Sequence, residues 1–328
     1  MTNKMKAIIA TGYGSPEVLQ FTEVSKPEPG DNEVLVKVVT ASATTADAMM
    51  RTGKPYFARL FLGIKKPKKA IPGTGFAGIV EHIGRNVTNF QVGDRVFGET
   101  AFGFSSNAEY LTVPESGVIL PMPENLDFTE AANFCDGHLT SYNFLKEIAQ
   151  VKPKEKVLIN GASGSLGTSA VQIARHMGAH VTAVCSGRNT GLVKSLGADE
   201  VIDYQQKDFT TSGKQYDYVY DTIGVSSFGA CKAILSEGGT YLSPVLKFTL
   251  LVQMLGTSLF GKKRAKFEAT GANNEDKLRG LLSEVLDIHK AGGLRTVIDR
   301  QYPLEKLAEA HRYIDSGRKK GNLVIVMA

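Results

Sequence analysis

The sequence predicts an α/β protein in which a doubly wound parallel sheet is joined to a partly open β-barrel. One observation is the unbroken succession of a short apolar strand at Val157–Ile159, a glycine-rich turn and a helical repeat that ends at Gly178. A second is the alternation of strand and helix patterns over residues 123–292. The third is a series of short strand patterns, separated by Gly and Pro, in the first 122 residues.

The glycine-rich turn carries the strongest functional signal. Ala162, Gly164 and Gly167 are spaced A-x-G-x-x-G between the strand and the helix. Small residues let backbone N–H groups approach a pyrophosphate, and the helix N-terminus adds about half a positive charge. A tight structural turn is the alternative, but the flanking strand and helix favour dinucleotide binding. The predicted contacts are Ala162, Ser163, Gly164, Ser165, Leu166 and Gly167.

Composition and charge narrow the possible functions. The 328 residues are 42% apolar and 22% charged, which is typical of a globular protein with two domains. A net charge of +5 is too mild to predict nucleic-acid binding. The three cysteines form no CxxC pair, so we expect a reducing cytoplasmic location and no disulfides. The apolar window 249–260 is shorter than the ~20 residues that span a bilayer, so no membrane insertion is expected.

The helices and strands are predicted from the spacing of apolar residues and from the Gly and Pro residues that separate them. Strands of the first third are expected at Lys6–Ala10, Val18–Val24, Val34–Thr40, Gly78–Ile83, Arg95–Gly98, Ala108–Val113 and Val118–Pro121, with one or two helical turns at Thr44–Arg51. The parallel sheet is expected from Val157–Ile159, His180–Cys185, Glu200–Ile202, Tyr216–Asp221 and Gly239–Leu242. Helices are expected at Leu126–Ala132, Gly137–Ile148, Asn189–Leu196, Ser226–Leu235, Glu275–Lys290 and Leu304–Ser316, with late strands at Val297–Tyr302 and Asn322–Met327. The apolar segment 250–260 is a core helix, a cleft wall or a subunit contact, and the sequence does not rank these.

Several segments resemble one family. Asp47–Gly53, Pro72–Val80, Val92–Val96 and Ala108–Tyr110 are similar to the GroES-like domain of the medium-chain dehydrogenase/reductase superfamily. Leu139–Tyr142, the glycine turn and Leu196–Tyr204 extend the resemblance, which is greatest to the zinc-independent quinone oxidoreductase-like branch. It implies a discontinuous GroES-like catalytic domain at 1–122 and 293–328, and a Rossmann nucleotide-binding domain at 123–292.

The resemblance also implies that zinc is absent. The zinc ligands of the metal-dependent members correspond to Thr44, Thr74, Gly75 and Asp136, and neutral hydroxyls are poor ligands for this ion. Without a Lewis acid, hydride transfer is easier to an acceptor that itself stabilises negative charge. A quinone or an α,β-unsaturated carbonyl is therefore the expected small-molecule substrate. A metal-independent NADP-dependent alcohol or aldehyde dehydrogenase is one alternative, and a non-enzymatic NADPH- or RNA-binding relative is another.

The end of the second sheet strand predicts NADPH as the cofactor. An NAD enzyme usually places a carboxylate there, but residues 185–189 read Cys-Ser-Gly-Arg-Asn. Ser186 and Arg188 can donate hydrogen bonds to a 2′-phosphate, with a solvated turn residue as the alternative for Arg188. Tyr204, by resemblance, lies near the adenine or the same phosphate.

The remaining site residues come mainly from the resemblance. Thr44 is expected on the loop over the nicotinamide, and Tyr56 either near the substrate or packed on the surface. His138 is a candidate proton donor, because its side chain titrates near neutral pH, or a hydrogen-bonded neighbour. Cofactor contacts are also expected from Thr140, and from Thr222 and Ser243 at the carboxyl ends of sheet strands. A homodimer is possible, and no nucleic-acid partner is expected.

Overall fold

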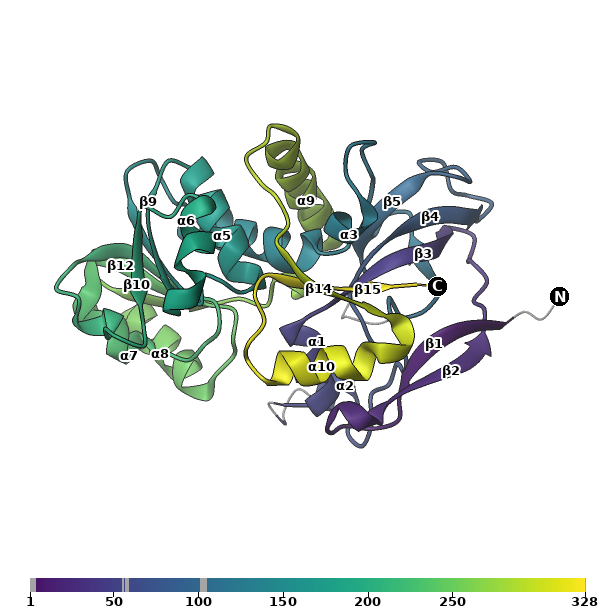
Figure 1. Ribbon diagram of the computed structural model, residues 1–328, viewed down its shortest axis with the longest axis horizontal. Helices are drawn as coiled ribbons and strands as arrows, with labels where there is room; N and C mark the ends of the chain where they lie inside the picture. The colour runs from purple at the N-terminus through teal and green to yellow at the C-terminus, as the bar shows by residue number, and fades with distance from the viewer. Residues whose placement is uncertain (1–3, 55, 57–58, 101–104, 328) are drawn as a thin grey trace. The chain divides into compact units, whose positions relative to one another are not determined.

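The computed structural model describes residues 4–54, 56, 59–100 and 105–327, and the chain forms two compact units (Figure 1). The first unit comprises residues 1–136, 271–284 and 296–328, and the second comprises residues 137–270 and 285–295. Compared with the predicted boundaries, residues 123–136 and 271–284 thus group with the first unit. Compactness does not show that either part folds alone, so the domain boundaries stay a prediction.

The second unit is built on a parallel six-stranded sheet with the order β10-β9-β8-β11-β12-β13. Its strands are β8 (Lys156–Asn160), β9 (His180–Cys185), β10 (Glu200–Asp203), β11 (Tyr216–Asp221), β12 (Leu235–Ser243) and β13 (Arg264–Phe267). The order reverses between β8 and β11, the switch point at which open α/β sheets bind ligands. Val157, Leu158 and Ile159 are fully buried, as expected for a strand covered on both faces. This sheet confirms the predicted Rossmann arrangement.

The helices of the second unit differ in detail from the prediction. They are α4 (Thr140–Tyr142), α5 (Ser165–His176), α6 (Thr190–Ser195), α7 (Phe228–Cys231) and α8 (Phe248–Leu259), and α9 (Glu275–Lys290) is shared between the units. The predicted helix 137–148 is present, but wide π-helical turns at Phe134–Leu139 and Asn143–Ala149 flank α4. The predicted helix 226–235 is wrong at its end. Leu235 is extended and pairs with Tyr216, so it starts β12.

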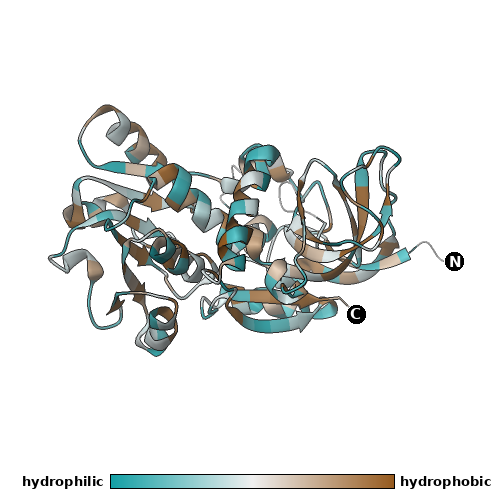
Figure 2. Cartoon of the chain, turned by 90° about the horizontal axis from the view of Figure 1, so that it is seen from above, coloured by the Kyte–Doolittle hydropathy of each residue, from teal (hydrophilic) through white to brown (hydrophobic). Residues whose placement is uncertain are grey.

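The first unit contains a mixed seven-stranded sheet with the order β14-β15-β3-β4-β5-β7, and β6 also pairs with β3. Its elements are β3 (Glu33–Ala43), β4 (Gly75–Ile83), β5 (Arg95–Glu99), β6 (Tyr110–Pro114), β7 (Val118–Pro121), β14 (Ile298–Pro303), β15 (Asn322–Val326), the hairpin β1 (Lys4–Ala10) and β2 (Leu19–Ser25), and helices α1 (Thr45–Thr52), α2 (Arg59–Leu62), α3 (Phe128–Ala131) and α10 (Leu307–Asp315). The long strand β3 pairs with three others and organises this sheet. In this unit the hydrophobic residues, drawn in brown, lie mainly on the strands (Figure 2). The arrangement matches the predicted GroES-like barrel.

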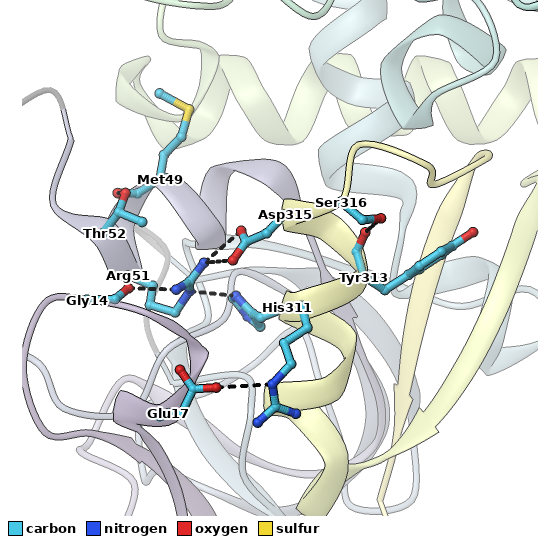
Figure 3. A network of polar contacts seen from close by, with 10 residues as sticks. Gly14, Glu17, Met49, Arg51, Thr52, His311, Tyr313, Asp315 and Ser316 are labelled. Atoms are coloured by element: carbon cyan, nitrogen blue, oxygen red, sulfur yellow. Dashed lines mark hydrogen bonds and ion pairs between the residues drawn. The ribbon is translucent and has the colours of Figure 1, made fainter.

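A buried arginine connects α1 to α10 in the first unit (Figure 3). The guanidinium of Arg51 is 1% exposed and donates to both carboxylate oxygens of Asp315 at 2.7 Å. It also donates to the Gly14 carbonyl oxygen at 2.6 Å. The Nε of Arg51 donates to Nδ1 of His311 at 3.2 Å. Burial, with the Arg51 charge adding to it, lowers the pKa of His311 to about 3, so this ring is a neutral acceptor. Three groups, the Gly14 carbonyl and two side chains of α10, thus depend on one cation.

Replacing Arg51 by Met should therefore lower the free energy of unfolding by about 2–4 kcal/mol, because the buried His311 and the Asp315 carboxylate lose their donor. The matched control is Arg312→Met, since Arg312 pairs with Glu17 only at the surface, where such a pair contributes at most about 1 kcal/mol. Urea unfolding of both variants measures the difference. Equal losses would contradict the assigned role of Arg51.

Candidate functional site

The glycine turn joins β8 to α5 in a conformation that needs two of its glycines. Gly161 has a φ of +77°, which side-chain-bearing residues rarely adopt. At Gly167 an added Cβ would lie 2.1 Å from the Gly161 carbonyl oxygen, so only glycine lets the first turn of α5 lie against the loop. The Ala162 amide donates to the Val184 carbonyl at 3.0 Å and ties the turn to β9. The fold itself therefore accounts for Gly161 and Gly167.

Gly164, in contrast, faces open space. It precedes α5 with a φ of −82°, and an added Cβ would meet only the Gly161 oxygen, at an ordinary 3.5 Å. No acidic residue lies in the first turn of α5, where the opening N–H groups of a helix have no intrahelical acceptor. Such a helix start attracts phosphate oxygens. The turn thus fits a pyrophosphate, with room left at Gly164 for its approach.

Neighbouring polar groups hold the turn in place. The Asn189 side-chain amide donates to the Ser163 hydroxyl at 2.9 Å. The Ser141 hydroxyl donates to the Leu166 carbonyl at 2.8 Å, which attaches α4 to the start of α5. Thr140, the first residue of α4, is half-buried beside it.

A buried carboxylate, absent from the predicted site, connects the carboxyl ends of the central strands. Asp221 ends β11 and is fully buried. Its carboxylate accepts hydrogen bonds from the side-chain amide of Asn160 at 2.9 Å and from the Tyr241 hydroxyl at 2.8 Å. It also accepts from the backbone amides of Gly224 and Ser226. Because β8, β11 and β12 each supply a partner or the acid itself, this one side chain fixes the edge where a ligand would bind.

The predicted cofactor residues Thr222 and Ser243 belong to the same edge. The Thr222 hydroxyl donates to the Asn160 carbonyl at 2.8 Å, and the Ser243 hydroxyl donates to the Asp221 carbonyl at 2.9 Å. Both side chains are more than 90% buried. Their hydroxyls therefore hold strand ends together, and a cofactor contact from either stays a prediction.

The end of β9 presents one group that favours a phosphate and one that opposes it. Arg188 is exposed, as a phosphate site on the surface requires, whereas Ser186 is buried. However, an added Cβ at Gly187 would lie 2.6 Å from a carboxylate oxygen of Asp203, so this acid adjoins the turn. Asp203 pairs in register with Cys185 across the parallel strands, a relation that the sequence alone did not reveal. Tyr204 follows it and is 58% exposed.

In the first unit, Thr44 and Asp47 form a capping box at the start of α1. The Thr44 amide and hydroxyl lie 2.8 and 2.9 Å from Oδ2 of Asp47, and the Asp47 amide donates to the Thr44 hydroxyl at 3.0 Å. Burial raises the pKa of Asp47 to about 7 against the opposing effect of these hydrogen bonds, and the Asp136 charge raises it further. The Thr44 hydroxyl is thus engaged in the cap, which leaves its nicotinamide contact a prediction.

Tyr56 and His138 lie in contrasting surroundings. The Tyr56 side chain is 66% exposed, with the Arg59 guanidinium 4.9 Å from its ring centre, while residues 55 and 57–58 are outside the described part. His138 is 1% exposed, and its Nδ1 lies 2.8 Å from the Ser169 hydroxyl. Burial, followed by the nearby His289, lowers the pKa of His138 to about 3. This value disfavours proton donation near neutral pH and favours the hydrogen-bonded-neighbour alternative.

The positions that match family zinc ligands do not fit a metal. At Gly75 an added Cβ would lie 2.3 Å from the Ala132 carbonyl oxygen, so no ligating side chain can occupy this position without a backbone shift. The Thr44 hydroxyl serves the α1 cap instead. Among the residues that the structure describes, no three His, Cys, Asp or Glu side chains are grouped to hold an ion. Within the same described part, no helix has both the length and the apolar character that crossing a membrane requires.

Comparisons with known proteins agree with this geometry. Residues 30–124 match the family model of the alcohol dehydrogenase GroES-like domain, and residues 196–325 match that of the zinc-binding dehydrogenases. The chain is 34% identical to the chloroplastic quinone-oxidoreductase QR1 of Triphysaria versicolor, over 98% of both chains. A solved quinone oxidoreductase from Coxiella burnetii superposes with a TM-score of 0.87 at 28% identity, covering 99% of this chain and all of the other. A mycobacterial protein solved in complex with NADPH gives a TM-score of 0.82 at 25% identity, covering 98% of this chain and 99% of the other.

The two glycines allow a matched test of the turn. Gly164→Ala should weaken dinucleotide binding about tenfold or more while changing the free energy of unfolding by no more than about 1 kcal/mol, because the added methyl group faces open space. Gly167→Ala should instead destabilise the fold by about 1–3 kcal/mol or more, because its methyl group meets backbone. Calorimetric titration and urea unfolding separate the effects. Unchanged binding by Gly164→Ala would exclude this turn as the site.

The low pKa of His138 predicts a pH-dependent stability. The folded state keeps the ring neutral, so the stabilisation is complete above about pH 6.5 and is lost as pH falls toward 3. Over this window the wild type should lose roughly 1 kcal/mol per pH unit more than His138→Gln. Unfolding at several pH values measures the slopes. If folded His138→Gln lost most oxidoreductase activity at pH 7, a catalytic role would be supported after all.

Proposed function

Since this chain belongs to the medium-chain dehydrogenase/reductase superfamily, in its quinone oxidoreductase-like branch, we propose that it uses NADPH to reduce a quinone or an α,β-unsaturated carbonyl without zinc. The observation that carries this proposal is the open glycine turn at the start of α5, where Gly164 leaves space that the fold does not need. The position closed at Gly75 supports the metal-free chemistry.

The cofactor residues are assigned from the edge of the parallel sheet. Gly164–Gly167 would receive the pyrophosphate. Thr222 and Ser243 lie at strand ends on the same edge, and Thr140 starts α4, which Ser141 attaches to the start of α5. Ser186 and Arg188 would donate to the 2′-phosphate, with the exposed Tyr204 ring beside the adenine. When bound, NADPH supplies a hydride. The Asp203 carboxylate repels a phosphate at this place, so we expect Arg188 to offset it and the preference over NADH to be moderate.

The acceptor class follows from what the chain can and cannot provide. Reduction adds a hydride to carbon and a proton to the product, so negative charge develops on an oxygen during the reaction. A quinone or enone delocalises that charge itself, and the protein then needs to position the acceptor and donate hydrogen bonds. Tyr56 is the better candidate donor, because its side chain is exposed whereas Thr44 is engaged with Asp47. A cytoplasmic location and a homodimer stay predictions from the sequence.

The direct test is NADPH oxidation with quinones, enones and aldehydes as acceptors, with metal content measured on the same sample. We expect turnover with quinones or enones and less than stoichiometric zinc. Turnover with aldehydes alone would favour the alternative dehydrogenase, and stoichiometric zinc with activity lost on chelation would contradict the metal-free proposal. Binding of RNA at physiological salt, with no turnover of any acceptor, would favour the non-enzymatic alternative.

Arg188→Ser tests the choice of cofactor. Loss of one charge-assisted hydrogen bond should lower kcat/KM for NADPH about tenfold and leave NADH nearly unaffected. Asp203→Asn should have the opposite effect and raise kcat/KM for NADPH, because a charge that repels the phosphate is removed. Arg175→Ser is the control, since Arg175 forms an exposed ion pair with Asp199 elsewhere on the unit. A wild-type preference for NADH would reject the proposed cofactor.

A further inference from the structure

The segment 59–69, which contains α2, is attached to the first unit by its inward-facing residues. The Tyr13 hydroxyl donates to the Gly63 carbonyl at 2.6 Å, and the first residue of α2 donates through its guanidinium to two carbonyls at the end of α1. Leu62 and Pro67 lie around a small cavity together with residues of α1. A structured turn therefore sets the positions of the other side chains in this segment.

Two large apolar side chains of the segment point instead to solvent. Leu60, on α2, is 68% exposed, and Ile64, two positions beyond the helix, is 72% exposed. In Figure 1, α2 lies at the lower margin of the first unit. A single exposed apolar residue is ordinary, so the meaning of this pair depends on its neighbours.

Three lysines follow Ile64 within four positions, and their charges are not neutralised. Lys65, Lys66 and Lys68 are exposed. Within the part of the chain that the structure describes, their ammonium groups have no hydrogen bond or ion pair. Residues 48–80 contain neither Asp nor Glu. Positive charge therefore adjoins the two apolar side chains, and we call these three lysines and the two apolar residues the α2 surface.

The backbone holds the lysines beside Ile64. The Lys68 amide donates to the Leu62 carbonyl at 2.8 Å, which closes a loop around the residues between them. Gly63 has a φ of +126°, and an added Cβ there would lie 2.2 Å from the Lys66 carbonyl oxygen. Because only glycine fits at this point, one compact turn carries Ile64 and the three cations together.

The composition of the α2 surface selects among possible occupants. Single-stranded nucleic acid binds best where aromatic rings stack on its bases, and neither Leu60 nor Ile64 offers a ring. A second copy of this chain in a twofold contact would bring the same lysines against one another. An anionic lipid surface offers headgroup charge to the lysines and the start of the acyl region to the apolar side chains. Lipid is thus the occupant that uses both kinds of side chain.

We propose that the α2 surface docks this protein reversibly on anionic membranes. Leu60 and Ile64 enter the boundary between headgroups and acyl chains, while Lys65, Lys66 and Lys68 contact the headgroups. A basic run is ordinarily a solvated face, and the exposed apolar pair beside it distinguishes this one. The inference does not depend on the proposed reduction, because none of these five residues is assigned to the cofactor or the acceptor.

Co-sedimentation with lipid vesicles tests this inference on the full chain. The probes are vesicles of phosphatidylcholine alone and of phosphatidylcholine with about 30% phosphatidylserine, at physiological and at high salt. Wild type should bind the anionic vesicles and lose about tenfold in partition constant at high salt, because salt screens the lysines. Lys65→Gln/Lys66→Gln should lose about tenfold, and Ile64→Gln should lose several-fold.

Each variant has a matched control elsewhere on the chain. Lys152→Gln/Lys154→Gln removes two exposed lysines of the second unit, and Val92→Gln replaces a side chain between β4 and β5 that is 60% exposed. Both controls should bind vesicles as wild type does. Thermal unfolding and NADPH binding should be the same for all variants, because every substituted side chain is at the surface and outside the assigned site.

Absence of binding to anionic vesicles, equal binding to neutral ones, or an equal loss in a control would overturn the proposal. So would salt-sensitive binding of the wild type to single-stranded RNA in place of vesicles. A wild-type dimer in sedimentation velocity that Ile64→Gln dissociates, without any vesicle binding, would also overturn it.

Discussion

The buried carboxylate of Asp221 is the constraint on which the nucleotide-binding edge depends. Burying a charge is costly unless donors surround it, and here two side chains and two backbone amides supply them. These donors come from β8, β12 and the loop after β11, so the carboxylate fixes the relative positions of the segments that carry the site. Because Gly161 follows β8 directly, this arrangement also sets the position of the glycine turn.

In the first unit, two buried acidic side chains have raised pKa values. Burial raises the pKa of Asp47 to about 7 and that of Glu99 to about 8, and the charge of Asp136 raises both further. Burial lowers the pKa of Lys319, against the opposing effect of Asp136 and Asp47.

Much of the fold could be predicted because local patterns decide it. An apolar run predicted β8, the alternation of strand and helix patterns predicted β9 and β11, and helix α9 was expected with the bounds that it has. Strand β13 was missed because two of its four residues are charged and only pairing with β12 makes it a strand. The register between β9 and β10 brings Asp203 to the predicted phosphate turn, which no local pattern shows. His138 carried a plausible role in the sequence, but its burial against α5 depends on the tertiary structure.

The three cysteines are free and buried, and burial raises the pKa of each thiol, to about 11 for Cys185 and Cys231 and well above the ordinary value for Cys135. Quinones and enones are electrophiles that add covalently to thiolates. At neutral pH a thiol with a pKa of about 11 is ionised in roughly one molecule in ten thousand. An acceptor of either proposed class would therefore meet buried, protonated thiols rather than reactive thiolates.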